Sequence, residues 1–238
     1  MKAVVLVLLG FVLAAPARAA EQTETAPVDV ALVLVSDVSR SIDDSEFQLQ
    51  KQGYHAAFTN PDVVAAIARG PAGAIAVAYV EFASVGEVTT VLDWTVIHDA
   101  ASAQGFAERL VAAPRSFAGR TAIGAGIAEA TAMLNASGYQ ATRRVIDVCG
   151  DGTSNAGPPV EVMRNRAVAA GITVNGLTII NDHPVSWVFA HVQPPGGLTA
   201  WYRTHVTGGP GSFVLEVHDF ANFGQAMTRK LISEIASR

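Results

Sequence analysis

Three short segments of the chain carry oxygen-bearing side chains at a spacing that suits a metal ion. Asp37, Ser39 and Ser41 alternate along the segment SDVSRS, so their side chains can turn toward one point while the intervening residues turn away. Thr121 and Asp151 add a hydroxyl and a second carboxylate further along the chain. Hard oxygen donors, with no histidine or thiolate among them, favour Mg²⁺, Mn²⁺ or Ca²⁺ over zinc or copper. The five residues therefore predict a divalent-cation site, with Mg²⁺ as the expected ion.

The three segments occupy similar places in the predicted secondary structure. Residues 28–36 form an apolar, valine-rich run that is typical of a strand buried on both faces, and Asp37 follows it directly. Asp151 follows a second strand, predicted at residues 143–149, and Thr121 opens a predicted helix. In open α/β sheets, ligands bind at the edge formed by the carboxyl ends of the strands. The fold therefore predicts that the three segments converge at that edge.

Strands and helices alternate along the rest of the chain. The other strands are expected at residues 74–82, 88–94, 172–180 and 213–217. Helices are expected at residues 42–60, 61–68, 99–112, 121–134, 160–170, 198–206 and 219–236. The alternation predicts an α/β fold with a doubly wound, mostly parallel six-stranded sheet and helices on both faces. The second and third strands are close enough to pair as a hairpin, which places one antiparallel strand at an edge.

Residues 1–19 have the pattern of a secretory signal peptide. A lysine supplies the positive start, residues 3–15 are an apolar core, and Ala17-Arg18-Ala19 fits the small-residue cleavage rule. Cleavage after Ala19 and export to the periplasm or the medium are expected. The alternative is an uncleaved membrane anchor, for which the apolar run is short. Residues 20–27 are a polar lead-in, and residues 28–238 are predicted to form one domain.

The charge balance argues against two classes of partner. Loss of residues 1–19 removes two basic residues and leaves 14 basic against 21 acidic residues, a net charge of −7. Such a chain is not expected to bind nucleic acid or an anionic membrane surface. No later apolar run reaches the roughly 18 residues of a membrane-spanning helix. Cys149 is the only cysteine, so no intramolecular disulfide can form, and its thiol is expected to be buried.

On these residues the chain resembles a von Willebrand factor type A domain with a metal-ion-dependent adhesion site. Asp37-Val38-Ser39-Arg40-Ser41 matches the DxSxS motif of that family, and Gly119-Arg120-Thr121 matches its threonine loop. Cys149-Gly150-Asp151-Gly152 matches its strand-end aspartate, although many members have threonine or serine before that residue. The resemblance covers residues 28–236. The stretches VDVALVLVSDVSRSID, DVCGDGTSN and GGPGSFV are similar to an uncharacterised family of exported bacterial type A-like proteins.

The resemblance implies a role for each residue of the site. Ser39 and Ser41 are expected to bind the metal directly through their hydroxyls. Thr121 is expected to bind directly or through water, and Asp37 and Asp151 mostly through bound water. Simpler roles are the alternative, because Asp, Ser and Thr also cap helices and an Asp-Gly pair also forms turns.

Other polar residues near these motifs have open roles. Arg40, between the two serines, is predicted either to steer an acidic partner toward the metal or to be a solvated arginine. Asn155, in the loop after the strand-end aspartate, is a candidate for the rim of the site. Asp147 lies inside a predicted strand, where a charge is unusual, and is expected to pair with Arg143 or Arg144 or to face a polar edge, with a structural rather than a catalytic role.

The function expected from these features is binding rather than catalysis. An exported module would capture the carboxylate of an Asp or Glu on a partner protein or peptide through the metal. A metal-dependent hydrolase is the runner-up, because no histidine or glutamate lies in the predicted metal loops to act as a base. A metal-free interaction protein of the same fold is the third possibility. The irregular stretch of residues 181–201, with the neighbouring Tyr202, carries an aromatic group that is expected to cover the core or, alternatively, to form a partner surface: Trp187, Phe189, Trp201 and Tyr202.

Overall fold

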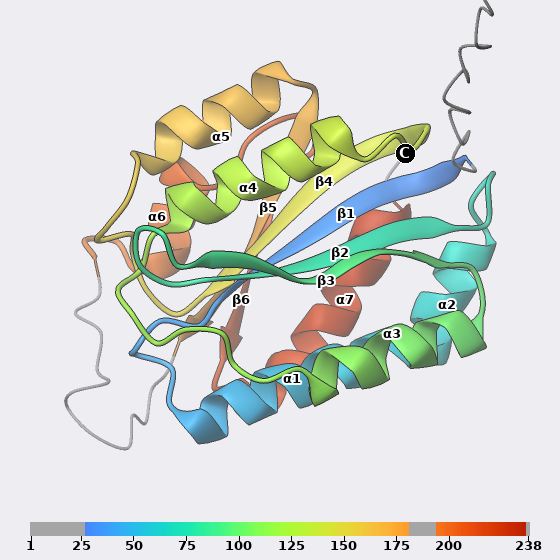
Figure 1. Cartoon of the computed structure of the whole chain (residues 1–238), viewed down its shortest axis with the longest axis horizontal. Helices are drawn as coiled ribbons and strands as arrows, with labels where there is room; N and C mark the ends of the chain where they lie inside the picture. The colour runs from blue at the N-terminus through green and yellow to red at the C-terminus, as the bar shows by residue number, and fades with distance from the viewer. Residues whose placement is uncertain (1–26, 181–193, 237–238) are drawn as a thin grey trace, which may run out of the picture.

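The computed structural model describes residues 27–180 and 194–236, so the predicted signal peptide and most of the 181–201 stretch lie outside the described residues (Figure 1). The strands are β1 (Val28–Asp37), β2 (Ile75–Phe82), β3 (Val88–Ile97), β4 (Ala141–Gly150), β5 (Ile172–Ile180) and β6 (Val214–His218). The helices are α1 (Asp44–Phe58), α2 (Pro61–Ala68), α3 (Ala100–Ala112), α4 (Ile123–Ala136), α5 (Val160–Ala169), α6 (Leu198–His205), η1 (Phe220–Asn222) and α7 (Phe223–Ala236). None of these helices is long and apolar enough to cross a membrane.

The six strands form one sheet in the order β3-β2-β1-β4-β5-β6. Neighbouring strands are parallel except β2 and β3, and the antiparallel β3 lies at an edge, as predicted. The chain moves outward from β1 to β2 and β3, and then returns to place β4 on the other side of β1. The carboxyl ends of β1 and β4 therefore flank the point where the winding reverses, which is where open α/β sheets bind ligands.

β1 forms the centre of the core, and all ten of its residues are buried. Successive side chains of a strand point to opposite faces of the sheet. Leu32 and Leu34 pack in a cluster with side chains of α1, α2, α3 and α7, whereas Val33 and Val35 pack with those of α4, α5 and α6. Figure 1 shows the two helical layers on opposite faces of the sheet. The predicted doubly wound α/β fold is confirmed.

α4 lies unusually close to the sheet because it contains glycine where it crosses β1. A Cβ atom at Gly126 would lie 2.7 Å from Val35 Cγ1, closer than real Cβ atoms approach. The small residues of this helix therefore allow close packing on the sheet, and they bring the start of α4 up to the end of β1.

The buried charge on β4 has a different partner from the one predicted. Asp147 Oδ1 lies 2.8 Å from Lys230 Nζ on α7, and the same lysine also pairs with Glu234. The guanidinium group of Arg143 instead donates to carbonyl oxygens in the last turn of α7, and that of Arg144 donates to a carbonyl oxygen at the end of α5. Carbonyls in the last turn of a helix have no partner within the helix, so arginines at the neighbouring strand end bind them. The prediction that Asp147 pairs with Arg143 or Arg144 was wrong.

Candidate metal centre

The five predicted side chains meet at the carboxyl edge of β1 and β4. Ser39 Oγ lies 3.1 Å from Ser41 Oγ and 3.1 Å from Thr121 Oγ1. Ser41 Oγ donates to Asp151 Oδ1 at 2.9 Å. Asp37 Oδ1 accepts a hydrogen bond from the backbone nitrogen of Ser39 at 2.7 Å. Hydrogen bonds thus join the three segments into one polar cluster.

The side chains of this cluster do not cap the helices that follow them. The N-cap of α1 is Asp43, whose carboxylate accepts hydrogen bonds from two backbone N–H groups of the first turn. The N-cap position of α4 is occupied by Ala122, which makes no side-chain cap hydrogen bond. The hydroxyl of Thr121 donates to Ser39 instead. The helix-capping alternative is therefore wrong for both loops.

The cluster is buried although all of its groups are polar. Asp37, Ser39, Thr121 and Asp151 are buried, and Ser41 is half-buried. A cation favours the charged form of a buried carboxylate, and hydroxyl and carboxylate oxygens are donors that Mg²⁺, Mn²⁺ and Ca²⁺ accept. Within residues 27–180 and 194–236, no three His, Cys, Asp or Glu side chains gather in a group that could hold a metal. A cation bound at this edge would therefore depend on the hydroxyls, which fits the donor set.

The two predicted rim residues take different positions. Asn155 Oδ1 accepts from the Thr121 nitrogen at 3.0 Å, and the Asn155 nitrogen donates to the Thr121 carbonyl at 2.9 Å. Asn155 is exposed, and it holds Thr121 in place from the β4–α5 loop. Arg40 is also exposed, and its side chain makes no hydrogen bond or ion pair with any described residue. The Arg40 nitrogen donates to the Gly119 carbonyl at 2.9 Å, which ties the serine loop to the threonine loop.

Sequence reasoning missed the role of Tyr202, on α6, which is fully buried beside the cluster. Its hydroxyl has no hydrogen-bond partner among the described residues, and a Cβ atom at Gly150 would lie only 2.6 Å from it. Burial raises the pKa of Tyr202, and the charges of Asp37, Cys149 and Asp151 raise it further. A neutral hydroxyl beside two carboxylates is well placed to bind a water molecule of a hydrated cation. The sequence identified this tyrosine only as one member of an aromatic group.

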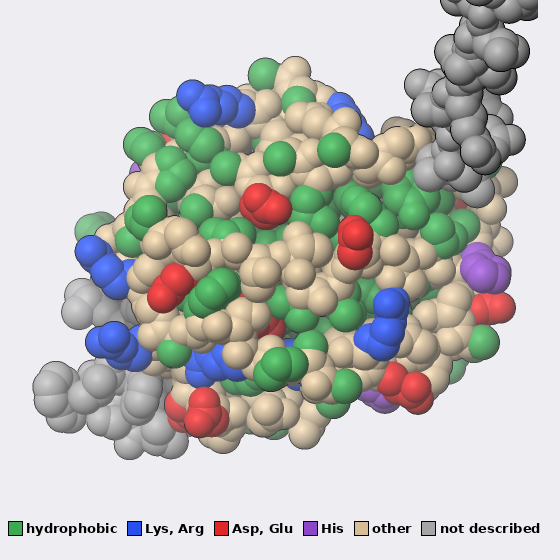
Figure 2. Space-filling view, viewed as in Figure 1, with side chains coloured by type: hydrophobic (Ala, Val, Ile, Leu, Met, Phe, Trp, Pro, Cys, Tyr) green, Lys and Arg blue, Asp and Glu red, His purple; other side chains and the backbone are tan. Residues whose placement is uncertain are grey.

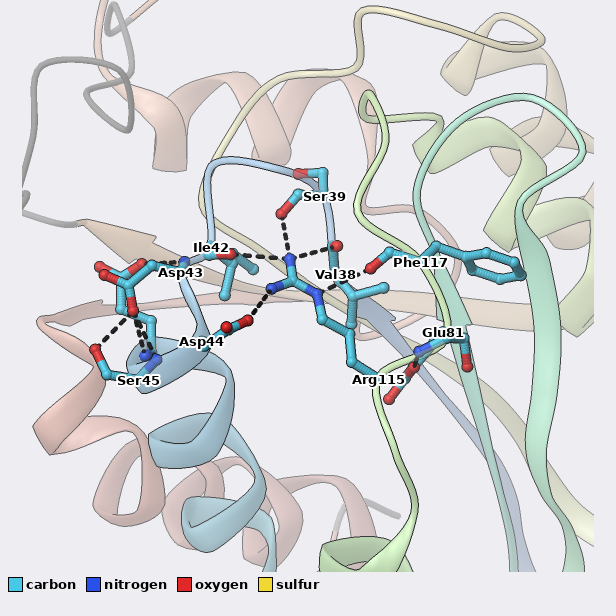
Figure 3. Close-up of polar contacts among 11 residues, drawn as sticks. Val38, Ser39, Ile42, Asp43, Asp44, Ser45, Glu81, Arg115 and Phe117 are labelled. Carbon is cyan, nitrogen blue, oxygen red and sulfur yellow. Dashed lines mark hydrogen bonds and ion pairs between the residues drawn. The ribbon is translucent and has the colours of Figure 1, made fainter.

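Glu46 and Arg115 were also missed. Glu46 is buried in the first turn of α1, where burial raises its pKa and the charges of Asp43 and Asp151 add to the rise. Arg115 lies in the α3–α4 loop, and its guanidinium donates to backbone carbonyls of the serine loop (Figure 3). No sequence pattern indicated Arg115, because its main acceptors are backbone atoms that every residue carries.

Solved structures of low sequence identity share this fold. Proximal thread matrix protein 1 from the mussel byssus matches 89% of this chain with a TM-score of 0.62 at 16% identity. Another structure of that protein, described as having a zinc-occupied MIDAS motif, matches 90% with a TM-score of 0.60 at 17% identity. A von Willebrand factor type A protein from Catenulispora acidiphila matches 89% with a TM-score of 0.57 at 17% identity. The matches span 48%, 50% and 43% of those chains, so this chain is about half as long, and at such identity the likeness shows the fold alone.

A search of curated proteins gave no match. The family described as "Protein of unknown function (DUF1194)" matches residues 27–238, which include every strand and helix of the structure. The predicted resemblance, both to the type A fold and to an uncharacterised family with that fold, is confirmed. The chain belongs to the DUF1194 family and has the von Willebrand factor type A fold.

Proposed function

We propose that this chain is a divalent-cation-dependent binding module that holds a carboxylate of a partner protein. The cation would be bound by the cluster of Asp37, Ser39, Ser41, Thr121 and Asp151, with Mg²⁺ first and Mn²⁺ or Ca²⁺ as alternatives. The observation that carries the proposal is the hydrogen-bonded convergence of these five side chains at the carboxyl edge of the sheet. The zinc-occupied MIDAS motif described for a mussel byssus protein of the same fold supports it.

The donor set favours binding over bond cleavage. Two carboxylates balance the charge of a divalent cation, and three neutral hydroxyls add donors without excess negative charge. A cation held in this way supplies an electrophilic centre at which a partner carboxylate can complete the coordination shell. Ser41 is the least buried of the five residues and so marks the side open to a partner. Hydrolysis would require a base that activates water, and the five residues include neither histidine nor glutamate. Glu46, the buried glutamate in the first turn of α1, already accepts a hydrogen bond from the Asp43 nitrogen as part of the capping box of that helix.

The proposed partner is a protein or peptide that presents Asp or Glu. The exposed side chain of Arg40 is available to attract such a partner toward the cluster. Figure 2 shows basic side chains, interspersed with acidic ones, at the end of the molecule where this edge lies, on the left of the view. We further propose that residues 1–19 are cleaved as a signal peptide and that residues 28–238 act in the periplasm or outside the cell.

Calorimetric titration with Mg²⁺ and Mn²⁺ tests the metal site. Wild type is expected to bind one ion per chain, and Ser39→Ala/Ser41→Ala to bind at least about 100-fold more weakly, because two direct donors are lost. The matched control is Ser137→Ala/Ser212→Ala, which removes two hydroxyls at the opposite edge of the sheet and is expected to bind as wild type does. Failure of wild type to bind either ion, or equal binding by the two double variants, would refute the metal site.

Capture from an envelope extract, with and without a chelator, tests the binding role. Partners that wild type retains with Mg²⁺, and that both chelation and the Ser39→Ala/Ser41→Ala change release, would support the proposal. Metal-dependent hydrolysis of generic ester or phosphoester substrates by wild type, lost in the same double variant, would favour the hydrolase instead.

A further inference from the structure

The serine loop directs its backbone carbonyls to one arginine. Arg115 Nη2 lies 2.8 Å from each of the carbonyl oxygens of Val38, Ser39 and Ile42 (Figure 3). These residues surround the serines of the cluster, and Ser39 contributes its hydroxyl to the cluster and its carbonyl to Arg115. The conformation of the loop is therefore coupled to the position of one guanidinium group.

Arg115 is itself held in place. Its Nε donates to the Phe117 carbonyl at 2.9 Å, and its guanidinium lies 5.5 Å from the ring centre of Phe47 on α1. Its side chain is 15% exposed, so its hydrogen bonds to carbonyls are largely shielded from water. The ion pair with Asp44 adds little, because that carboxylate is fully exposed.

The loop that carries Arg115 also carries Thr121, and buried charges attach it to the core. Glu81 Oε2 on β2 accepts from the Ser116 nitrogen at 2.9 Å. Lys51 Nζ on α1 donates to the carbonyl of Ala113 and lies 3.9 Å from Glu81 Oε1. Arg115 thus adds a charged side-chain link between a firmly attached threonine loop and the serine loop, beside the hydrogen bonds of Arg40 to Gly119 and of Thr121 to Ser39.

We infer that Arg115 is a positioning residue for the metal site, an inference that rests on the function proposed above. Three carbonyl oxygens that converge on one point repel one another unless a cation lies between them. Arg115 supplies that charge permanently, so the serine loop keeps the conformation in which the hydroxyls of Ser39 and Ser41 meet Thr121. Without Arg115 the loop relaxes, and a cation must first restore its shape. The guanidinium also donates from Nε to the Phe117 carbonyl, and the single ammonium nitrogen of lysine could not make this second contact while it lies among the three carbonyls.

Mn²⁺ affinity of Arg115 variants tests this inference. Arg115→Ala is expected to bind Mn²⁺ about 10- to 100-fold more weakly than wild type, the usual loss when a group that orients the ligands is removed. The Mn²⁺ affinity of Arg115→Lys is expected to lie between that of wild type and that of Arg115→Ala. The control is Arg109→Ala, which removes an exposed arginine of α3 that bonds Thr95, and is expected to leave Mn²⁺ affinity unchanged. Calorimetry well below each variant's Tm, with circular dichroism as the check of folding, reports on folded molecules only.

A purely structural role for Arg115 predicts a different result. In that case Arg115→Ala and Arg115→Lys would lower Tm but bind Mn²⁺ within about twofold of wild type, well short of the loss expected for a positioning residue, and the inference would be overturned. If Arg115→Ala does not fold, the Mn²⁺ affinities of Arg115→Lys and Arg115→Gln distinguish the positioning role from the purely structural one. Absence of Mn²⁺ binding by wild type would overturn the proposed function itself, and the wild-type titration identifies that case.

Discussion

Replacing Asp147 by asparagine is expected to change how the stability of this protein depends on pH. Asp147 is fully buried on β4 and pairs with Lys230, which also pairs with the buried Glu234. One ammonium group therefore serves two carboxylates. Burial raises the pKa of Asp147 to about 7; the charge of Lys230 opposes this rise, and that of Glu234 adds to it. The proton bound near neutral pH belongs to the three groups together.

The sign of the effect follows from where the proton is held. Between pH 4 and pH 7 the folded protein keeps a proton that the unfolded chain, with an aspartate pKa of 3.8, has released. The free energy of unfolding therefore falls as pH rises through this range, by about 1.4 kcal/mol per pH unit at the steepest. Asp147→Asn has no such proton to lose. Wild type is thus expected to lose about 2 kcal/mol relative to the variant between pH 5 and pH 7.

Urea unfolding of the metal-free protein from pH 5 to pH 8 measures this difference. The control is Asp93→Asn, which makes the same chemical change at an exposed aspartate on β3 and measures the effect of that change outside the core. Contributions from other titrating groups cancel when the variant is compared with wild type at each pH. A difference between Asp147→Asn and wild type that does not change with pH would refute the reasoning.

Two further changes test packing and buried charge by urea unfolding. Gly126→Ala is expected to lower the free energy of unfolding by about 1–3 kcal/mol, because the added Cβ would overlap Val35. Gly105→Ala lies in open space on α3 and is expected to raise the free energy of unfolding by about 0.5–1 kcal/mol, because alanine favours a helix more than glycine does. Equal effects of the two alanines would contradict the packing argument. Lys51→Met is expected to lower the free energy of unfolding by about 3–5 kcal/mol, because the buried carboxylate of Glu81 loses the ammonium group that pairs with it. A loss below about 1 kcal/mol would show that this pair contributes little.

The fold was predictable because its main signals are local. The valine-rich run of β1 indicated a strand buried on both faces, and the alternation of strands and helices indicated a doubly wound sheet. The end of β3 was less predictable. The strand continues past Trp94 to Ile97, because the antiparallel ladder with β2 continues until Ile97 pairs with Ile75. Pairing between strands is not a local property, so a sequence pattern places the end of an edge strand poorly.

The candidate site was predictable only in part. Each of its three segments carries a local motif, and the order of the strands brings those motifs to one edge. Arg115 contacts backbone carbonyls of the serine loop, and the hydroxyl of Tyr202 lies against Gly150. Neither contact corresponds to a sequence motif. The partner of Asp147 was missed for a related reason. Nearby arginines on β4 were the obvious candidates, but Lys230 on the last helix packs over that part of the sheet.

Among the described residues, the two buried lysines lie on one side of the sheet, and this asymmetry bears on the candidate metal centre. Lys51 and Lys230 lie in the layer formed by α1, α3 and α7, and Arg115, in the loop that follows α3, packs against Phe47 of the same layer. The serine loop is attached to this charged layer through Arg115, whereas Thr121 and Asp151 lead into helices of the opposite, mainly apolar layer. The cluster therefore forms where the two layers meet. Its shape depends on contacts that cross between them, among them Arg115 to the serine loop, the Arg40 nitrogen to the Gly119 carbonyl, and the hydroxyl hydrogen bonds among the site residues.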